Sequence, residues 1–384
     1  MYLWETKQRK VMKKAFVFLA VWFVWPVAGQ QKTLPSLPLD DFQDGIHHWN
    51  LLHAERNYPR LRPDQVTEIA DNFLAYQNED GGWPKNLDWL GVLDADSVKR
   101  TLTPRYREST VDNRNTYPQI EYLAQVYTLT GIDKYRQGAE KGIGYILNTQ
   151  NASGGWRGWD VDAITFNDDV TTGAMDLMLR VKEGREPFAW ADAAVREKAA
   201  RSFERALDVT LRCQIVVDGV KTAWCQQHDH RTLAPVKART YELPCITPFE
   251  SSDVVLFLMS LENPDRRVIE AVKSAVAWLR KAALEGFRIE RVPVAESEIT
   301  NHEYPYNLVV AEDPSAKPIW ARFYEVDSRV IPFLCNRDGI KVYKLSDVLP
   351  ERRMGYSWYG YWPEKVFAAY PAWLARVGET DGTK

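Results

Sequence analysis

The sequence contains a repeat with a period of 73 residues. Gln77 and Gly81-Gly82-Trp83 recur 73 positions later as Gln150 and Gly154-Gly155-Trp156. A helix-like apolar pattern ends at each glutamine, and glycines just past that point are typical of a helix stop. Two helix-like segments lie between the copies. A period of this length, with two helices in each unit, is typical of stacked helical hairpins.

A third, degraded copy is formed by Gln214 followed by Thr222-Ala223-Trp224. A few helical hairpins can stack in an open array or close into a ring. Two clean copies and one weak copy favour a closed ring of few units. The sequence therefore predicts a mainly α fold in which the helices occur as hairpins.

The apolar periodicity and the turn residues along the chain predict where the helices and strands lie. Helices are predicted at residues 63–77, 118–130, 133–150, 172–183, 189–212, 252–262, 264–284 and 363–377. Short irregular β-hairpins are predicted at two Asp-Gly turns, within residues 215–224 and 330–344. Residues 30–62 are expected to form an irregular lead-in, and residues 285–330 are mixed and interrupted by proline. No linker follows residue 30, so we expect residues 30–384 to form a single domain.

Residues 1–29 resemble a secretory signal peptide. Five basic residues precede the apolar run of residues 15–25, and Val27-Ala28-Gly29 offers small residues for cleavage. The apolar run is too short to span a bilayer comfortably, and no later stretch is longer and equally apolar. We expect a secreted or periplasmic, monomeric protein that has no membrane contact after processing.

The charge balance argues against a nucleic-acid ligand. Without residues 1–29 the chain keeps 44 basic and 51 acidic residues, a net charge of −7. Cys213 and Cys225 flank a predicted hairpin, and an oxidising compartment would permit them to pair. Buried free thiols are an equally open interpretation of the four cysteines.

A polar cluster precedes the helix predicted from Pro118. It contains Asp112 and Asn113, and carboxylate and carbonyl oxygens are the ligands that calcium prefers. The alternative is that Asp112 or Asn115 only caps the helix. The same alternative applies to the second cluster, Asn167-Asp168-Asp169, which precedes the helix predicted at residues 172–183. If both loops meet at the mouth of a helical ring, their carboxylates would form a cation site.

Two arginines lie in motifs rich in aromatic residues. Arg239 follows a segment that starts at Trp224, for which the alternative interpretation is a solvated basic loop. Arg322 lies within Trp-Ala-Arg-Phe-Tyr-Glu, for which the alternative is a cation–π or salt-bridge arginine. A guanidinium group matches the geometry of a carboxylate. Carboxylate pairs together with such arginines suggest an anionic ligand bridged through a cation.

These motifs together resemble the family 10 polysaccharide lyases, which are pectate lyases with an (α/α)3 toroid. The resemblance covers residues 60–375. It rests on Gly-Gly-Trp-Pro-Lys-Asn at 81–86, Ser-Thr-Val-Asp-Asn at 109–113, Ile-Thr-Phe-Asn-Asp-Asp at 164–169, Thr-Ala-Trp-Cys-Gln-Gln-His-Asp at 222–229, Ala-Arg-Thr-Tyr-Glu-Leu-Pro at 238–244, and Trp-Ala-Arg-Phe-Tyr-Glu at 320–325 with Gly-Tyr-Ser-Trp-Tyr-Gly at 355–360. The resemblance implies calcium-dependent β-elimination of polygalacturonate, an anionic polysaccharide.

The resemblance also implies roles for particular residues. Asp112, Asn113 and either Asp168 or Asp169 would bind Ca²⁺ at a substrate carboxylate. Arg239 would be the base that removes the C5 proton, and Arg322 would bind the substrate carboxylate. Arg114 stands where smaller residues are expected, which makes it a candidate for an additional substrate contact. Trp83 is our candidate for an aromatic residue that contacts the sugar.

Two other functions remain open from the sequence. An inverting glycoside hydrolase on an (α/α) barrel would use Asp112 and Asp168 as its carboxylate pair. A non-catalytic carbohydrate-binding protein would use the many Trp and Tyr residues as a sugar platform. A lyase product absorbs in the ultraviolet through its new C4–C5 double bond, whereas a hydrolase product does not.

Overall fold

A computed structural model of the chain describes residues 34–53, 57–295 and 305–381. The chain separates into two units, Met1–Leu34 and Pro35–Lys384, and every element below belongs to the second unit. The predicted signal peptide, residues 1–29, lies outside the described residues. Among the described residues, no helix has the length and apolar character that crossing a membrane requires.

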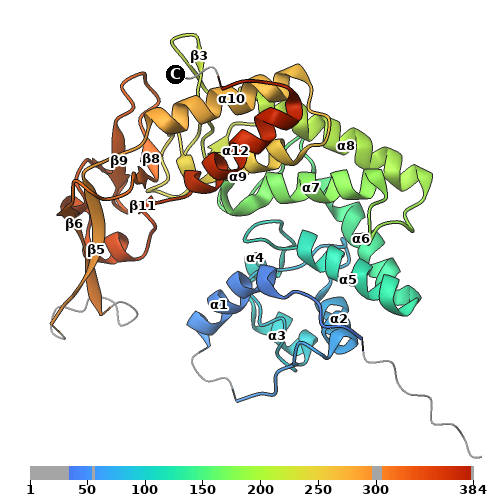
Figure 1. Ribbon diagram of the computed structural model, residues 1–384. Helices are drawn as coiled ribbons and strands as arrows, with labels where there is room; N and C mark the ends of the chain where they lie inside the picture. Colours follow the sequence, from blue (N-terminus) through green and yellow to red (C-terminus); the bar gives the residue numbers. More distant parts are fainter. Residues whose placement is uncertain (1–33, 54–56, 296–304, 382–384) are drawn as a thin grey trace, which may run out of the picture. The chain divides into compact units, whose positions relative to one another are not determined.

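Helices provide most of the regular structure (Figure 1). The α-helices are α1 (Gln43–Leu52), α2 (Val66–Tyr76), α3 (Ala95–Thr101), α4 (Pro104–Arg107), α5 (Tyr117–Thr130), α6 (Asp133–Thr149), α7 (Val170–Glu183), α8 (Ala193–Arg212), α9 (Pro248–Ser260), α10 (Arg266–Lys281), α11 (Pro350–Met354) and α12 (Pro363–Val377). Short 3₁₀ turns are η1 (Asp40–Phe42), η2 (Asn167–Asp169) and η4 (Leu345–Asp347). The predicted mainly α class is confirmed, and closure into a toroid stays a prediction.

The strands are short and antiparallel. They pair as β1 (Ile164–Thr165) with β4 (Gln227–His228), β2 (Val216–Val217) with β3 (Val220–Lys221), β5 (Phe287–Pro293) with β6 (Tyr306–Glu312), β7 (Trp320–Ala321) with β11 (Tyr359–Gly360), and β9 (Pro332–Cys335) with both β8 (Phe323–Tyr324) and β10 (Lys341–Val342). Both predicted Asp-Gly hairpins are present, as β2–β3 and β9–β10.

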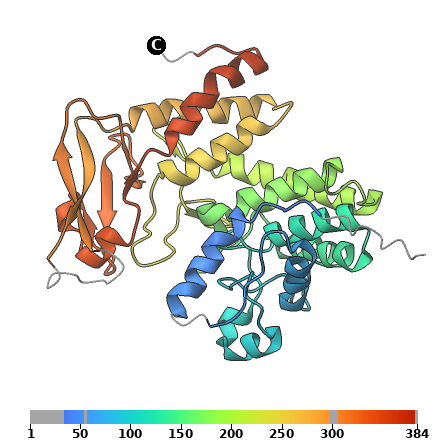
Figure 2. The ribbon, with the colours of Figure 1, turned by 60° about the horizontal axis from the view of Figure 1, so that its bottom comes forward.

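The short helices α3, α4 and α11 are absent from the sequence prediction, and two longer segments also differ from it. The expected irregular lead-in contains α1, whose Ile46 and Trp49 are buried. The mixed segment forms the β5–β6 hairpin, the longest pair of strands among the described residues (Figure 2). Its period-two pattern is weak because most of its side chains are partly or fully exposed, so the sequence carries little burial signal there.

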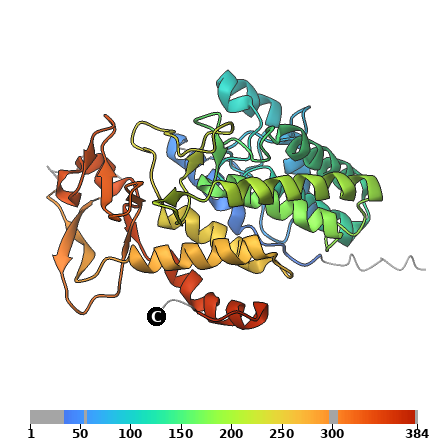
Figure 3. The same cartoon turned by 90° about the horizontal axis from the view of Figure 1, so that it is seen from above.

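Consecutive helices pack side by side as hairpins. Helix α5 lies against α6 and α7 against α8, and the second pair is also visible from above (Figures 1 and 3). Helices α9, α10 and α12 contact one another as well. Glycine permits the closest approach in the first hairpin, because a Cβ atom on Gly142 would lie 2.3 Å from a side-chain carbon of Ile120.

The repeated glutamines make the same pair of hydrogen bonds in all three copies. Each side-chain amide donates to a carbonyl in the turn that follows it and to a carbonyl of a later helix. The acceptors are Gly81 (2.8 Å) and Gly138 (2.9 Å) for Gln77, Gly154 (2.7 Å) and Ser202 (2.9 Å) for Gln150, and Thr222 (3.0 Å) and Ala271 (2.9 Å) for Gln214. The degraded third copy is therefore a true structural repeat.

The repeated tryptophans belong to the core. Their indole N–H groups donate to helix carbonyls, from Trp83 to Phe73 (2.7 Å), from Trp156 to Ile146 (2.8 Å) and from Trp224 to Thr210 (2.7 Å). All three side chains are fully buried. The prediction that Trp83 contacts a sugar is therefore wrong for this structure, since its packing and hydrogen bond leave no surface for a ligand.

All four cysteines are buried free thiols. Cys213 and Cys225 are not paired, so the permitted disulfide is absent from the structure. Cys225 instead lies near Cys245, with 3.9 Å between the two Sγ atoms.

Candidate active site

Three loops of the repeat carry the polar residues into one region of the fold. In each unit a threonine N–H donates to the carbonyl of the repeat tryptophan, from Thr110 to Trp83 (3.1 Å), from Thr165 to Trp156 (2.9 Å) and from Thr247 to Trp224 (2.9 Å). The chain then leads into α5, α7 and α9. Asp112, Asp168 and Glu250 lie within three residues of these threonines, so the repeat gives each loop a carboxylate at a related position.

Asp112 is buried, and each of its two carboxylate oxygens has a partner in the protein. One carboxylate oxygen lies 2.5 Å from the Lys85 ammonium, and the other accepts the backbone N–H of Trp159 at 2.8 Å. Lys85 is itself buried, with its ammonium 4.7 Å from the centre of the Trp159 ring. The capping alternative is wrong for this loop, because Thr116 occupies the cap position of α5 and no side chain caps the helix there.

The loop backbone before α5 is strained. Asn113, Arg114 and Thr116 have φ angles of 57°, 50° and 73°. A β-branched residue rarely adopts a positive φ, but the Thr116 hydroxyl donates to the Thr110 carbonyl (2.7 Å) and accepts the Trp83 N–H (3.2 Å). Strain that is held in place by hydrogen bonds in this way is typical of functional loops.

Asp168 and Asp169 have different surroundings. Burial, together with the nearby charge of Asp112, raises the pKa of Asp168 to about 7, although the charges of Arg239 and Arg322 act to lower it. Asp169 instead accepts a hydrogen bond from Arg114 Nε at 2.7 Å. No side-chain cap is formed at the start of α7, so the capping alternative is wrong here as well.

Arg114 is half-exposed and lies beside Asp169, away from the Asp112 carboxylate contacts. With Asp41, Asp169 and Asp253 it lines a cavity of about 330 Å³. Its predicted contact with substrate stays a prediction.

Arg322 is buried among aromatic rings and polar partners. Its Nη2 donates to Glu250 Oε1 and, at 3.3 Å, to Asn167 Oδ1, and its guanidinium carbon lies 4.2 Å from the centre of the Phe249 ring. Burial lowers the pKa of Arg322, but the interactions with Glu250, Tyr356 and Asp168 together outweigh burial, and the net shift is upward. Arg322 therefore makes both the salt bridge and the cation–π contact that the alternative interpretation predicts. It also shares Asn167 with Asp168, because the Asn167 amide donates to Asp168 at 2.7 Å.

Arg239 is paired with Glu242, to which its Nη2 donates, and lies 3.9 Å from Asp160 through Nε. Burial lowers the pKa of Arg239, but the hydrogen bond and charge of Glu242 outweigh burial, and the net shift is upward. The solvated-loop alternative is wrong only for the start of this segment, since Gln226, Gln227 and His228 are buried, whereas residues 231–240 are partly or fully exposed.

A hydrogen-bonded chain joins the two arginines. Gln226 Nε2 donates to Glu250 (2.7 Å), to Asn167 (3.0 Å) and to the Tyr356 hydroxyl (3.3 Å). That hydroxyl donates to Glu242 at 3.4 Å. The sequence motifs contain Gln226, Glu242 and Tyr356, but no spacing along the chain identifies them as partners. Lys85 was also missed, because its contact with Asp112 joins residues 27 positions apart.

Asp168 and Arg322 share Asn167 as a hydrogen-bond partner, and the charges of Asp112, Arg239 and Arg322 all act on the pKa of the Asp168 carboxyl. In the described part of the chain, no three His, Cys, Asp or Glu side chains form a cluster able to hold a metal ion. The donor set that fits calcium is therefore smaller: the two repelling carboxylates of Asp112 and Asp168, and the side-chain oxygen of Asn113, which accepts no hydrogen bond from a described residue.

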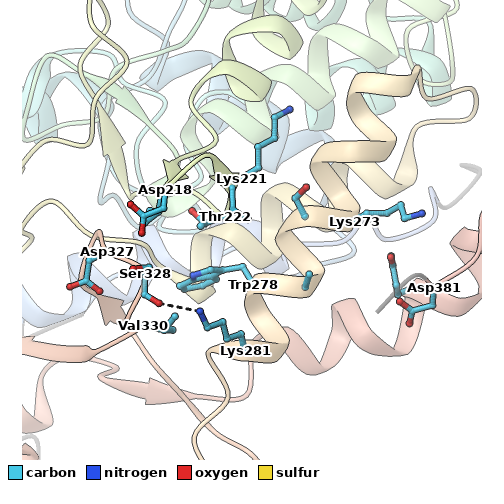
Figure 4. A pocket seen from close by; sticks show the side chains of 15 residues that line it. Asp218, Lys221, Thr222, Lys273, Trp278, Lys281, Asp327, Ser328, Val330 and Asp381 are labelled. Carbon is cyan, nitrogen blue, oxygen red and sulfur yellow. Dashed lines mark hydrogen bonds between the residues drawn. The ribbon is translucent and has the colours of Figure 1, made fainter. Parts of the chain in front are cut away.

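Two further cavities have different characters. One of about 680 Å³ is lined by Thr110, Val111 and Trp159. Another, of about 470 Å³, lies against α10 around Trp278, where Lys281 donates to the Ser328 carbonyl at 3.1 Å (Figure 4). None of the predicted site residues lines this second cavity.

Comparisons with known proteins agree with the resemblance of the motifs. A family model described as pectic acid lyase matches residues 77–367. The family 10 polysaccharide lyase from Cellvibrio cellulosa is 27% identical, with a TM-score of 0.66 over 88% of this chain and 99% of that one. A mutant of that enzyme in complex with trigalacturonic acid is 26% identical, with a TM-score of 0.66 over 90% and 100% of the two chains. No curated protein matches the sequence.

Proposed function

Because this chain belongs to the pectic acid lyase family and is a polysaccharide lyase, we propose that it cleaves α-1,4-polygalacturonate by calcium-dependent β-elimination. The products would be 4,5-unsaturated oligogalacturonates. The observation that supports this proposal is that the Asp168 carboxyl interacts electrostatically with the carboxylate of Asp112 and with the guanidinium groups of Arg239 and Arg322. A neighbour in complex with trigalacturonic acid supports an anionic substrate of this class.

We assign calcium to Asp112, Asn113 and Asp168. Asp168 is preferred over Asp169 because Asp169 is already neutralised by Arg114. The charge of Asp112 raises the pKa of the buried Asp168 carboxyl, and two carboxylates that repel in this way are stabilised when a cation lies between them. When bound, calcium supplies Lewis-acid stabilisation of the charge that develops on the substrate carboxylate. Lys85 holds Asp112 in place and keeps one of its oxygens neutralised when the cation is absent.

Arg322 is proposed to bind the carboxylate of the substrate. Its Nε is buried and has no hydrogen-bond partner among the described residues, so one donor of the guanidinium fork is unused. An unsatisfied buried donor costs free energy, and a ligand carboxylate would recover it. Glu250 and Asn167 fix the other side of the guanidinium group.

Arg239 is proposed as the base. It would take the proton from C5, the C4–C5 double bond would form, and the C4–O4 bond would break, with water donating the proton that O4 needs. The raised pKa of Arg239 opposes this role, since a base must be neutral. The reaction therefore requires that the pair with Glu242 be weakened by the cationic surroundings or by alkaline pH, and we expect a high pH optimum.

The test is the release of product absorbance from polygalacturonate with calcium and with EDTA. The lyase assignment predicts ultraviolet absorbance with calcium and loss of it with EDTA. Reducing ends without absorbance would instead indicate a hydrolase. Arg239→Ala should abolish turnover but retain binding of trigalacturonate, and the exposed Arg201→Ala on α8 is the matched control.

We further propose that residues 1–29 direct export and that residues 30–384 form the catalytic domain. The protein would then act outside the cytoplasm, where the polymeric substrate is found. Determining the N-terminal residue of the exported protein tests the cleavage position.

A further inference from the structure

A cavity of about 680 Å³ lies beside the candidate active site and has no role in the proposed chemistry. Its lining comes from α6, from the end of the segment after α4, and from the turn after the second repeat tryptophan. The side chains that matter for its chemistry are those of Arg105, Glu108, Tyr145, Arg157, Trp159 and Asp160.

One wall of this cavity is shared with the site. Thr110 and Val111 line it and directly precede Asp112. The backbone N–H of Trp159 holds the Asp112 carboxylate at 2.8 Å, and Asp160 lies 3.9 Å from Arg239. A polymer chain that followed this wall from the site would enter the cavity.

Arg157 is available to a ligand. It is exposed, and no carboxylate of the described residues lies within 4 Å of its guanidinium group. Its one hydrogen bond is from Nε to the Gly158 carbonyl at 3.3 Å. Arg105 differs, because it lies 3.7 Å from Asp160 and donates to the Trp159 carbonyl at 2.9 Å. The remaining free positive charge of the lining is therefore Arg157.

Tyr145 provides a neutral donor in the same lining. Its side chain is only 9% exposed, yet its hydroxyl forms no hydrogen bond with any described residue. Burial raises the pKa of Tyr145, so the hydroxyl stays protonated and can donate. A hydroxyl that has no protein partner among the described residues and lines an open cavity is free to bind a ligand or water.

We propose that this cavity is an outer subsite that binds one galacturonate unit away from the bond that is cleaved, with Arg157 contacting its carboxylate and Tyr145 one of its hydroxyls. A guanidinium fork suits a sugar carboxylate, and a phenolic hydroxyl suits a sugar hydroxyl. Glu108 also lines the cavity, and its negative charge repels an anion. Removing this charge should therefore strengthen binding of the sugar carboxylate. The inference rests on the proposed function, because it names part of the same polysaccharide groove.

The experiment measures kcat/KM for oligogalacturonates from trimer to hexamer. The wild-type value should rise with length, and Arg157→Gln should reduce that rise about five- to tenfold, since a charged hydrogen bond is lost. Tyr145→Phe should act in the same direction, whereas Glu108→Gln should increase the rise. Arg201→Gln, on the exposed face of α8, is the matched control and should leave the rise unchanged.

Binding of hexagalacturonate in EDTA, measured by calorimetry, provides a readout without turnover. It should weaken in Arg157→Gln and strengthen in Glu108→Gln. An unchanged length dependence in Arg157→Gln, with lyase activity intact, overturns the subsite alone. Absence of ultraviolet product from every oligomer in the wild-type protein overturns the proposed function and the subsite together.

Discussion

The ammonium group of Lys85 lies 2.5 Å from one carboxylate oxygen of Asp112, and both side chains are buried. A positive charge therefore already occupies one face of a carboxylate that we assign to calcium. Removing one partner of a buried pair leaves an uncompensated charge, which is more costly than the loss of an exposed pair. Lys85 would thus share this carboxylate with the proposed calcium ion.

Lys85→Met should destabilise the calcium-free protein by about 3 kcal/mol, because Asp112 and Asp168 then repel without compensation. Calcium should restore more of the unfolding free energy in this variant than it adds to the wild-type protein. Urea unfolding with EDTA and with calcium measures both effects, with the exposed Lys198→Met on α8 as the control. Equal stabilisation of both proteins by calcium would remove Asp112 from the ligand set.

Asp168→Asn and Asp169→Asn should respond differently to calcium. Calcium at about 100 times its Kd stabilises a protein that binds it by about 2.7 kcal/mol. This stabilisation should be lost in Asp168→Asn and kept in Asp169→Asn. In EDTA the order of stability should reverse. The pKa of Asp168 is raised to about 7 in the folded protein, so ionisation of this carboxyl destabilises the fold as pH rises. Asp168→Asn should therefore be the more stable variant at pH 8. Thermal unfolding of both variants at pH 8, with calcium and with EDTA, measures these effects.

Glu242→Gln should move the limb of the pH–rate profile on which kcat/KM rises with pH to lower pH by one unit or more. Glu242 raises the pKa of Arg239, so its neutral replacement lets the guanidinium group lose its proton more readily. The measurement is kcat/KM against pH from 7 to 11. Glu262→Gln, an exposed carboxylate that pairs with Arg185, is the control. A limb that stays in place in Glu242→Gln would contradict Arg239 as the base.

Protonation of His228 should destabilise the protein below about pH 6.5. Its Nε2 accepts the N–H of Cys225 at 3.0 Å, and Nδ1 donates to the Leu233 carbonyl at 2.9 Å, so the folded protein requires the neutral ring. Burial lowers the pKa of His228 to about 4, whereas the unfolded chain takes up the proton near pH 6.5. The stabilisation is complete above pH 6.5 and is lost as pH falls to 4, a change of about 3 kcal/mol.

Urea unfolding at pH 7.5, 5.5 and 4.5 checks this dependence. His228→Gln should flatten the pH dependence, whereas the exposed His47→Gln should retain it. The same steep dependence in His228→Gln would show that other groups are responsible.

Gln150→Ala should destabilise the fold by about 2 kcal/mol, because two carbonyl groups lose their donor at once. Gln77→Ala and Gln214→Ala should cost similar amounts, since both make equivalent bonds. Gln137→Ala, on the exposed face of α6, serves as the control and should change stability by less than about 0.5 kcal/mol. A small effect at Gln214 alone would mean that the third repeat contributes less than its hydrogen bonds suggest.

The sequence by itself determined the helical repeat, since local periodicity, helix stops and the Gln and Trp positions recur along the chain. The helices predicted around residues 118–130 and 133–150 appear as α5 and α6 within a residue or two. It also identified the loops that contain Asp112 and Asp168, because polar clusters before helices are visible without the fold. The spacing of apolar residues reflects which side chains are buried, and burial of apolar surface is the main driving force for forming these helices.

Only the tertiary structure decided which members of those loops face one another. Asp168 and Asp169 are adjacent in the chain, yet the charge of Asp112 raises the pKa of Asp168, whereas Asp169 pairs with Arg114. Likewise, Trp83 shares its motif with Lys85, but only Lys85 contacts the site. These choices depend on backbone torsions and on partners distant in sequence, and electrostatic coupling acts through space, so no spacing along the chain records them.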